Sequence, residues 1–296
     1  MRRLVVVTVV VLLWSAGRAL PMGASDATPA AAAHAHGGVM PAEGARLPPS
    51  ENSAKDALNH SPRHGEFSTV EVGATPVRVW IVYPERRDKA PVVIVIHEIF
   101  GLTDWIRAVA DQLAATGFIA VAPDLLSGKG PDGGGTDAFA SRDDVVKVVS
   151  GLARDEVMTR LNAVRAYSLA LPAASGRSAA VGFCWGGSTT FTYAVAQPAL
   201  NAAVVYYGTA PDDRPALAAI TAPVLGLYGG DDARVGATLP KTQGQMQELG
   251  KAYEPHVFEG AGHGFLRAQS GQHGANARAS EQAWPLTIAF LRQHTK

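Results

Sequence analysis

Cysteine is almost absent from this chain of 296 residues, since Cys184 is the only one. A single thiol has no intramolecular partner, so a disulfide-stabilised fold is excluded. Net charge is absent too, because 26 basic residues balance 26 acidic ones. Without a basic excess, neither nucleic acid nor an anionic membrane surface is expected as a partner. We expect a small, neutral or mildly charged ligand instead.

Long apolar runs are scarce, and the N-terminus holds the one that resembles a targeting segment. Met1, Arg2 and Arg3 precede "LVVVTVVVLLW", and small residues follow. This pattern predicts a secretory signal peptide over residues 1–24, cleaved near Ala19 or Ala24, and a periplasmic or secreted mature protein. The alternative is an uncleaved anchor, but the run is shorter than the roughly 20 apolar residues of a membrane-spanning helix. We therefore expect no stable membrane insertion after cleavage.

Residues 25–65 are rich in alanine, proline, glycine and serine and show no helical or strand period. We interpret them as a flexible linker that activity does not require, ahead of a domain at residues 66–296. The linker contains His34, His36, His60 and His64. A histidine tract can bind metal, but no cysteine or ordered spacing accompanies these residues, so a solvated tail is the preferred interpretation.

Strand-like and helix-like segments alternate after the linker. Continuous apolar runs such as "APVVIVI" are typical of strands buried on both faces of a parallel sheet. Helices are expected over residues 105–116 and 143–171, after Gly186, and over 239–250 and 280–294. This alternation predicts one α/β domain, with a mostly parallel central sheet and helices on both faces.

Cys184 lies in "VGFCWGGS", where an apolar strand meets the next helix. A lone cysteine is usually a small buried apolar residue. Here Gly182 and Gly186 flank it at two residues on either side, the pattern of a nucleophile elbow, whose sharp turn leaves no room for side chains there. The start of a helix is also expected to lower the thiol pKa.

Two further loops carry polar residues directly after predicted strands. "YGGDDARV" contains Asp231 and Asp232, which could simply cap the next helix, and "FEGAGHGF" contains His263, which could be a surface residue. In chain order, however, the loops supply nucleophile, acid and histidine, which is the order found in α/β-hydrolases.

A fourth loop, "IHEIFGL", places Glu98 and Ile99 after a buried strand. In an α/β-hydrolase the corresponding loop supplies one backbone N–H of the oxyanion hole, and the residue after the nucleophile supplies the other. These donors would be Ile99 and Trp185. Glu98 is either a structural ion-pair residue or part of the catalytic site.

From about Pro91 onward the chain resembles the dienelactone hydrolase (carboxymethylenebutenolidase) family, through "HEIFGL", "GFIAVAPDL", "VGFCWGG", "AVVYYG", "YGGDDARV" and "GAGHGFLR". The resemblance implies a triad of Cys184, His263 and Asp232. It favours Asp232 over Asp231 through the family's G-x-x-D-x-x-V spacing, and it implies that Glu98 helps to activate the thiol.

The resemblance also implies that two arginines hold a substrate carboxylate. Arg267 matches one of them, but Gly128 stands at the other position with Lys129 beside it. Recognition of the anionic dienelactone is therefore in question, and a changed substrate is expected. We expect Glu98 to keep Cys184 largely as a thiol until substrate binds.

The sequence thus predicts an exported, monomeric hydrolase of an ester or lactone that needs no cofactor or metal. There is no P-loop, and His97 with Glu98 lacks the second histidine of a zinc protease motif. Two alternatives stay open: a broad carboxylesterase or thioesterase, and a non-catalytic exported binding protein on a hydrolase scaffold.

Overall fold

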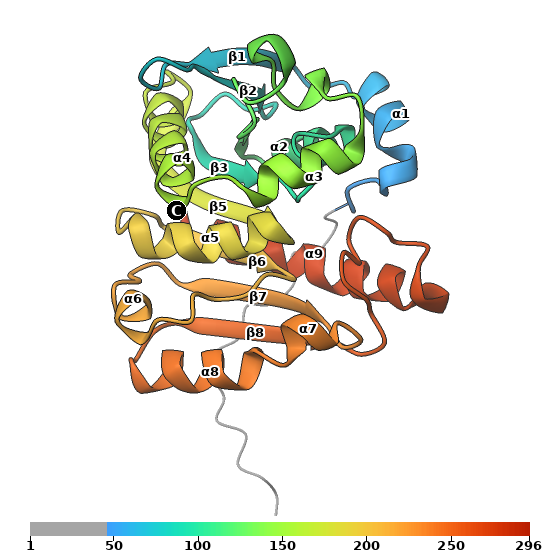
Figure 1. The fold of residues 1–296 in the computed structure, drawn as a ribbon, viewed down its shortest axis with the longest axis vertical. Coiled ribbons are helices and arrows are strands. Elements are labelled where there is room, and N and C mark those ends of the chain that lie inside the picture. Colours follow the sequence, from blue (N-terminus) through green and yellow to red (C-terminus); the bar gives the residue numbers. More distant parts are fainter. Residues whose placement is uncertain (1–45) are drawn as a thin grey trace, which may run out of the picture. The chain divides into compact units, whose positions relative to one another are not determined.

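The computed structural model describes residues 46–296, which contain a single eight-stranded sheet covered by helices (Figure 1). The strands are β1 (Gly65–Val70), β2 (Val77–Val82), β3 (Ala90–Ile96), β4 (Ile119–Pro123), β5 (Ala174–Phe183), β6 (Ala202–Tyr206), β7 (Val224–Gly229) and β8 (Tyr253–Phe258). Their order is β1-β2-β4-β3-β5-β6-β7-β8. The pairs β1–β2 and β2–β4 are antiparallel and all the others are parallel, so the predicted mostly parallel sheet is confirmed.

The helices are α1 (Ala54–Asn59), α2 (Asp104–Ala115), α3 (Arg142–Ser150), α4 (Arg154–Leu169), α5 (Trp185–Ala196), α6 (Arg214–Ala218), α7 (Ala233–Gly236), α8 (Leu239–Glu248) and α9 (Ala275–His294). The predicted helix over residues 143–171 is in fact two helices, α3 and α4. Gly151 ends α3, with its N–H bonded to the Val148 carbonyl, and Leu152 and Ala153 turn the chain before α4 begins. Only Gly151 in this stretch disfavours a helix, since leucine and alanine are good helix formers, so the sequence pattern alone does not reveal the break.

The core lies on both faces of the sheet, as the continuous apolar strands predict. In β3, Val93 and Val95 pack in the cluster that includes residues of α2 and α9, whereas Val92, Ile94 and Ile96 pack in the cluster that includes residues of α4 and α5. Successive side chains of a strand point to opposite faces, so each face receives every second residue. The parallel strands therefore end together at one edge, where the loops after β3, β5, β6, β7 and β8 meet.

The prediction of a flexible linker up to residue 65 is wrong for residues 46–65. This stretch contains the short 3₁₀ helix η1 (Glu51–Ser53) and α1. Pro48 and Ala54 are buried, and Leu47 and Leu58 pack against the core. Its few apolar residues are spaced irregularly, so a composition argument could not show that they meet a partner surface.

The predicted signal peptide, the rest of the linker, and His34 and His36 lie outside the described residues. Within residues 46–296, no helix combines the length and the apolar character that a membrane crossing requires.

Candidate active site

Cys184 occupies the tight turn between β5 and α5. Its backbone has φ 56° and ψ −116°, a conformation that non-glycine residues rarely adopt and that is often found at functional sites. A Cβ atom at Gly182 would lie 2.1 Å from the Gly186 carbonyl oxygen, and one at Gly186 would lie 2.3 Å from the His97 carbonyl oxygen. Both flanking glycines are therefore required by the close approach of the backbone, as the elbow pattern predicts.

The thiol of Cys184 is partly buried beside Glu98. Burial raises the thiol pKa, and the negative charge of Glu98 raises it further. Hydrogen bonding from the backbone N–H groups of Trp185 and Ile99 lowers the thiol pKa, as does the charge of Arg234, but burial dominates. The expected lowering at the helix start is thus outweighed. The two N–H groups predicted as oxyanion donors are thus the ones whose hydrogen bonding lowers the thiol pKa.

Glu98 is 3% exposed and lies at the end of β3. Burial raises the pKa of its carboxyl from 4.5 to about 7, against the lowering effect of the Arg267 charge, and the charge of Glu51 adds to the rise. Arg267 Nε lies 2.7 Å from Glu98 Oε2. That N–H is not directed along a hydrogen bond, so this contact is chiefly an attraction between charges.

His263 and Asp232 meet across the loops that follow β8 and β7. His263 Nδ1 lies 2.5 Å from Asp232 Oδ2, and Asp232 Oδ1 accepts from the Val235 N–H at 3.3 Å. Asp232 therefore caps α7 and also contacts the histidine, while Asp231 is exposed. A Cβ at Gly229 would lie 2.4 Å from the Ala261 carbonyl oxygen, so glycine there allows the two loops to approach.

Tyr207, which the sequence analysis did not single out, lies near His263 and its partner Asp232 and also near Glu98 and Cys184. Its ring centroid is 5.1 Å from that of His263, and its buried hydroxyl has no hydrogen-bond partner within residues 46–296. Burial raises its pKa well above 10, and the charge of Glu98 adds to this rise. Its place in "VVYYG", directly after β6, could have identified it by the strand-end rule used for the other loops.

The structure thus brings the predicted residues together in two groups. Cys184 lies with Glu98 and the N–H groups of Ile99 and Trp185, and His263 pairs with Asp232. No hydrogen bond joins the thiol to His263 among the described residues. Catalytic hydrogen bonds commonly tighten only when substrate is bound, so this geometry is compatible with a shared site.

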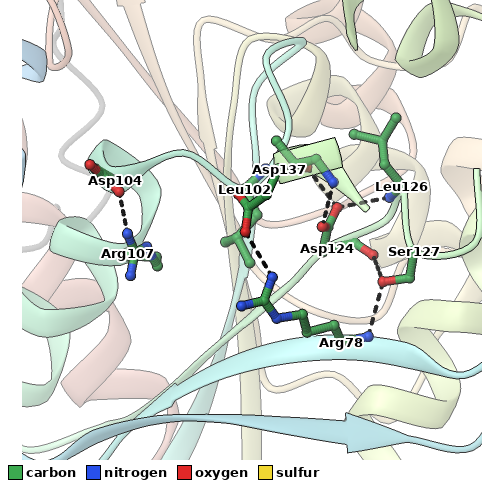
Figure 2. Close-up of polar contacts among 9 residues, drawn as sticks. Arg78, Leu102, Asp104, Arg107, Asp124, Leu126, Ser127 and Asp137 are labelled. Atoms are coloured by element: carbon green, nitrogen blue, oxygen red, sulfur yellow. Dashed lines mark hydrogen bonds and ion pairs between the residues drawn. The ribbon is translucent and has the colours of Figure 1, made fainter. Parts of the chain in front are cut away.

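Figure 2 shows the polar network that fixes the loop after β3. The buried Asp124 accepts from the Leu126 N–H and from both the N–H and the hydroxyl of Thr136. The Thr136 hydroxyl oxygen also accepts from the Leu102 N–H, which ties the loop containing Ile99 to the loop after β4. Arg78 extends the network, because its backbone N–H donates a hydrogen bond to Ser127 Oγ. Asp124 therefore helps to position the loop that contains Ile99, acting through Thr136.

The side chains of Ile99 and Trp185 pack with apolar residues of α3 and the loop before it. These are Leu126, Phe139, Val145, Val148 and Val149. The wall beside the two N–H donors is thus hydrocarbon, which favours an apolar group of a substrate.

The structure disfavours a side chain at residue 128, the position at which the resemblance implies a second substrate-binding arginine. Gly128 has φ +76°, and a Cβ there would lie 2.2 Å from Thr75 Cγ2. The neighbouring Lys129 is engaged by Glu156, with Nζ 2.8 Å from Oε1. Over the described range, 46–296, no three histidine, cysteine, aspartate or glutamate side chains converge as metal ligands.

Sheet order, elbow and loop arrangement define the class of the protein as an α/β-hydrolase. The model of the dienelactone hydrolase family matches residues 77–295, and the chain belongs to that family.

Its relatives share most of the described length. The chain is 35% identical over 223 residues to a candidate carboxymethylenebutenolidase of Methylorubrum extorquens, covering 71% of this chain and 75% of the relative. A candidate dienelactone hydrolase of Klebsiella pneumoniae superposes with a TM-score of 0.68 at 26% identity, covering 78% of this chain and 99% of that one. A dienelactone hydrolase-like promiscuous phosphotriesterase from metagenomic libraries gives a TM-score of 0.64 at 27% identity, covering 77% and 98%.

Proposed function

We propose that the protein hydrolyses a carboxylic ester or lactone with Cys184 as nucleophile. The observation that carries the proposal is the strained elbow of Cys184, together with the N–H groups of Trp185 and Ile99, whose hydrogen bonding lowers the thiol pKa. Donors placed at a nucleophile are also near the carbonyl oxygen of the ester that it attacks, where negative charge develops. The pairing of His263 with Asp232 supplies an oriented proton carrier on the neighbouring loops.

In the first half-reaction, the proton of the thiol passes to Glu98 and the thiolate attacks the carbonyl carbon. The carbonyl oxygen becomes an oxyanion held by the two backbone N–H groups. The C–O bond to the leaving group then breaks, and the departing oxygen takes a proton from His263, which enters the cycle as an imidazolium stabilised by Asp232 and regains this proton in the second half-reaction. The product is an acyl-thioester on Cys184 and a free alcohol or enol.

In the second half-reaction, His263 takes a proton from water, and the hydroxide attacks the thioester carbonyl. The C–S bond breaks, the acid is released, and the thiolate regains its proton from Glu98. Glu98 suits this exchange because a carboxyl with a pKa of about 7 can both accept and return a proton near neutrality. The raised thiol pKa supports a resting thiol, which limits oxidation in an oxidising compartment.

We propose export as well, from the N-terminal sequence pattern, with the mature protein acting as a monomer on small molecules and without a cofactor. Broad carboxylesterase or thioesterase activity is the nearest variant of this function. The phosphotriesterase activity described for one structural relative makes a neutral phosphotriester a useful addition to a substrate panel.

The test is a panel of esters, thioesters, lactones and a phosphotriester, assayed with the mature protein and with Cys184→Ala. We expect hydrolysis of at least one carboxylic ester or lactone, lost in Cys184→Ala, whose unfolding midpoint should stay close to that of the parent. A folded parent protein inactive on the whole panel would favour the binding-protein alternative.

A further inference from the structure

Beside the candidate site lies a cluster of four charged side chains, two carboxylates and two guanidinium groups. One of the carboxylates, that of Glu51, comes from the segment that precedes the sheet. Glu51, in η1, forms an ion pair with Arg267 through Oε2 and with Arg142 through Oε1, the latter at 2.9 Å. Arg267 also meets Glu98. One carboxylate from outside the strand-end loops thus engages both guanidinium groups.

The segment that carries Glu51 is fixed to the loop following His263. The Glu51 N–H donates to the Arg267 carbonyl at 3.0 Å, and Gln269 Nε2 donates to the Pro48 carbonyl at 2.9 Å. Both hydrogen bonds use backbone groups of the segment around η1, so they hold η1 in place whatever the side chain at residue 51. The carboxylate is therefore delivered to the arginines by the fold.

Phe100 orients the two arginines from the loop after β3. The guanidinium carbon of Arg142 lies 3.5 Å from the centroid of its ring, and that of Arg267 lies 5.3 Å away. Both arginines thus pack on the side chain of Phe100, which lies in the loop that contains Glu98 and Ile99, and Arg267 also contacts Glu98. Unpaired, they would attract an anionic substrate group.

Building on the proposed function, we propose that Glu51 is a specificity-determining residue, which occupies the anion-binding faces of Arg267 and Arg142 so that the site takes esters or lactones with an uncharged acyl part. The hydrocarbon wall around Ile99 and Trp185 fits such an acyl group. Lys129 offers no replacement cation, because Glu156 engages it.

A substrate carboxylate entering this region meets two obstacles. It has to displace Glu51 from both arginines or sit beside it, and two like charges at close range repel. It also meets Glu98, which is partly ionised at neutral pH. Arg234, which is exposed and has no ion pair among the described residues, is the remaining cation that acts on the thiol.

Alkylation of Cys184 tests the inference without requiring hydrolysis. Iodoacetamide and iodoacetate differ in charge but hardly in size, and the ratio of their rates cancels any change in the thiolate fraction. In Glu51→Gln we expect the ratio of the iodoacetate rate to the iodoacetamide rate to rise about tenfold. A tenfold change corresponds to about 1.4 kcal/mol, which is about the contribution of one hydrogen bond to a charged group. Raising the salt concentration should shrink this gain.

Matched variants separate the local effect from a change in net charge. Glu248→Gln removes the same charge at a remote exposed ion pair with Arg214, and it should leave the ratio unchanged. Adding Arg142→Gln to Glu51→Gln should reverse most of the gain, whereas adding Arg234→Gln should not. A ratio in Glu51→Gln within about twofold of the parent would overturn the inference, as would an equal rise in Glu248→Gln.

An ester pair provides the second readout. The ratio of kcat/KM for p-nitrophenyl hemisuccinate to that for p-nitrophenyl butyrate should be low in the parent protein and rise in Glu51→Gln. An unchanged ratio with both esters hydrolysed contradicts the specificity role alone. If neither ester is hydrolysed while the alkylation ratio still rises, the proposed function fails and the role of Glu51 in excluding anions stands.

Discussion

The buried carboxyl of Glu98 should make folding stability depend on pH in a direction opposite to that of most carboxylates. Its pKa is raised in the folded protein, chiefly by burial, so between pH 4.5 and about 7 the folded state holds a proton that the unfolded state has lost. The free energy of unfolding must then fall as the pH rises through this window. Most paired carboxylates instead lose their stabilising effect as the pH falls.

The magnitude follows from the two pKa values. A pKa that rises from 4.5 to about 7, at about 1.4 kcal/mol for each pKa unit, corresponds to about 3 kcal/mol between the two ends of the window. Glutamine has nearly the same shape and does not titrate. Relative to the parent, Glu98→Gln should therefore gain about 3 kcal/mol as the pH rises from 4 to 8.

The assay is urea unfolding of both proteins at several pH values, with the difference in unfolding free energy taken at each. Taking the difference removes the contributions of all other titrating groups that the substitution leaves alone. Glu248→Gln, at an exposed pair, serves as control and should give a flat difference. A flat difference for Glu98→Gln would refute the reasoning, because Glu98 would then ionise as freely in the folded protein as in the unfolded chain. Glu98→Gln should also hydrolyse ester slowly.

Four further outcomes are expected. Gly182→Ala should prevent folding or destabilise the protein strongly, because its Cβ would lie 2.1 Å from a carbonyl oxygen. Gly244 lies within α8 with open space around it, so Gly244→Ala should instead stabilise the protein by about 0.5–1 kcal/mol. Thermal or urea unfolding measures both effects. Asp232→Asn should lower kcat by a factor on the order of 10² or more, because the amide no longer orients and stabilises the His263 imidazolium; a kcat within about twofold of the parent would contradict this role. Intact-mass analysis of exported protein should show loss of about the first 24 residues; a full-length soluble exported species would rule out cleavage.

The sheet and the elbow could be predicted because each depends on local patterns. Apolar strands such as "APVVIVI" are continuous in sequence, and the need for Gly182 and Gly186 follows from the geometry of one turn. The rule that parallel strands end at one edge then named the loops that hold Cys184, Asp232 and His263. The same rule, applied to the end of β6, would also have included Tyr207.

Contacts between distant segments could not be predicted in this way. Glu51 lies in a stretch whose composition resembles a linker, and its partner Arg267 is 216 residues further along the chain. Nothing in the local pattern indicates that η1 packs against the loop after β8. The raised thiol pKa was likewise hidden, because the helix start is visible in the sequence while the burial of Cys184 and its proximity to Glu98 depend on the folded site.

The central claim is that Cys184 becomes acylated during turnover. The most direct test is to mix the protein with a p-nitrophenyl ester, quench with acid within milliseconds, and measure the masses of the protein and of the peptide that contains residue 184. The account predicts a species heavier by one acyl group, with the modification on Cys184, which appears before steady state and is absent in Cys184→Ala. Turnover without any acylated Cys184, or turnover at the parental rate by Cys184→Ala, would contradict it.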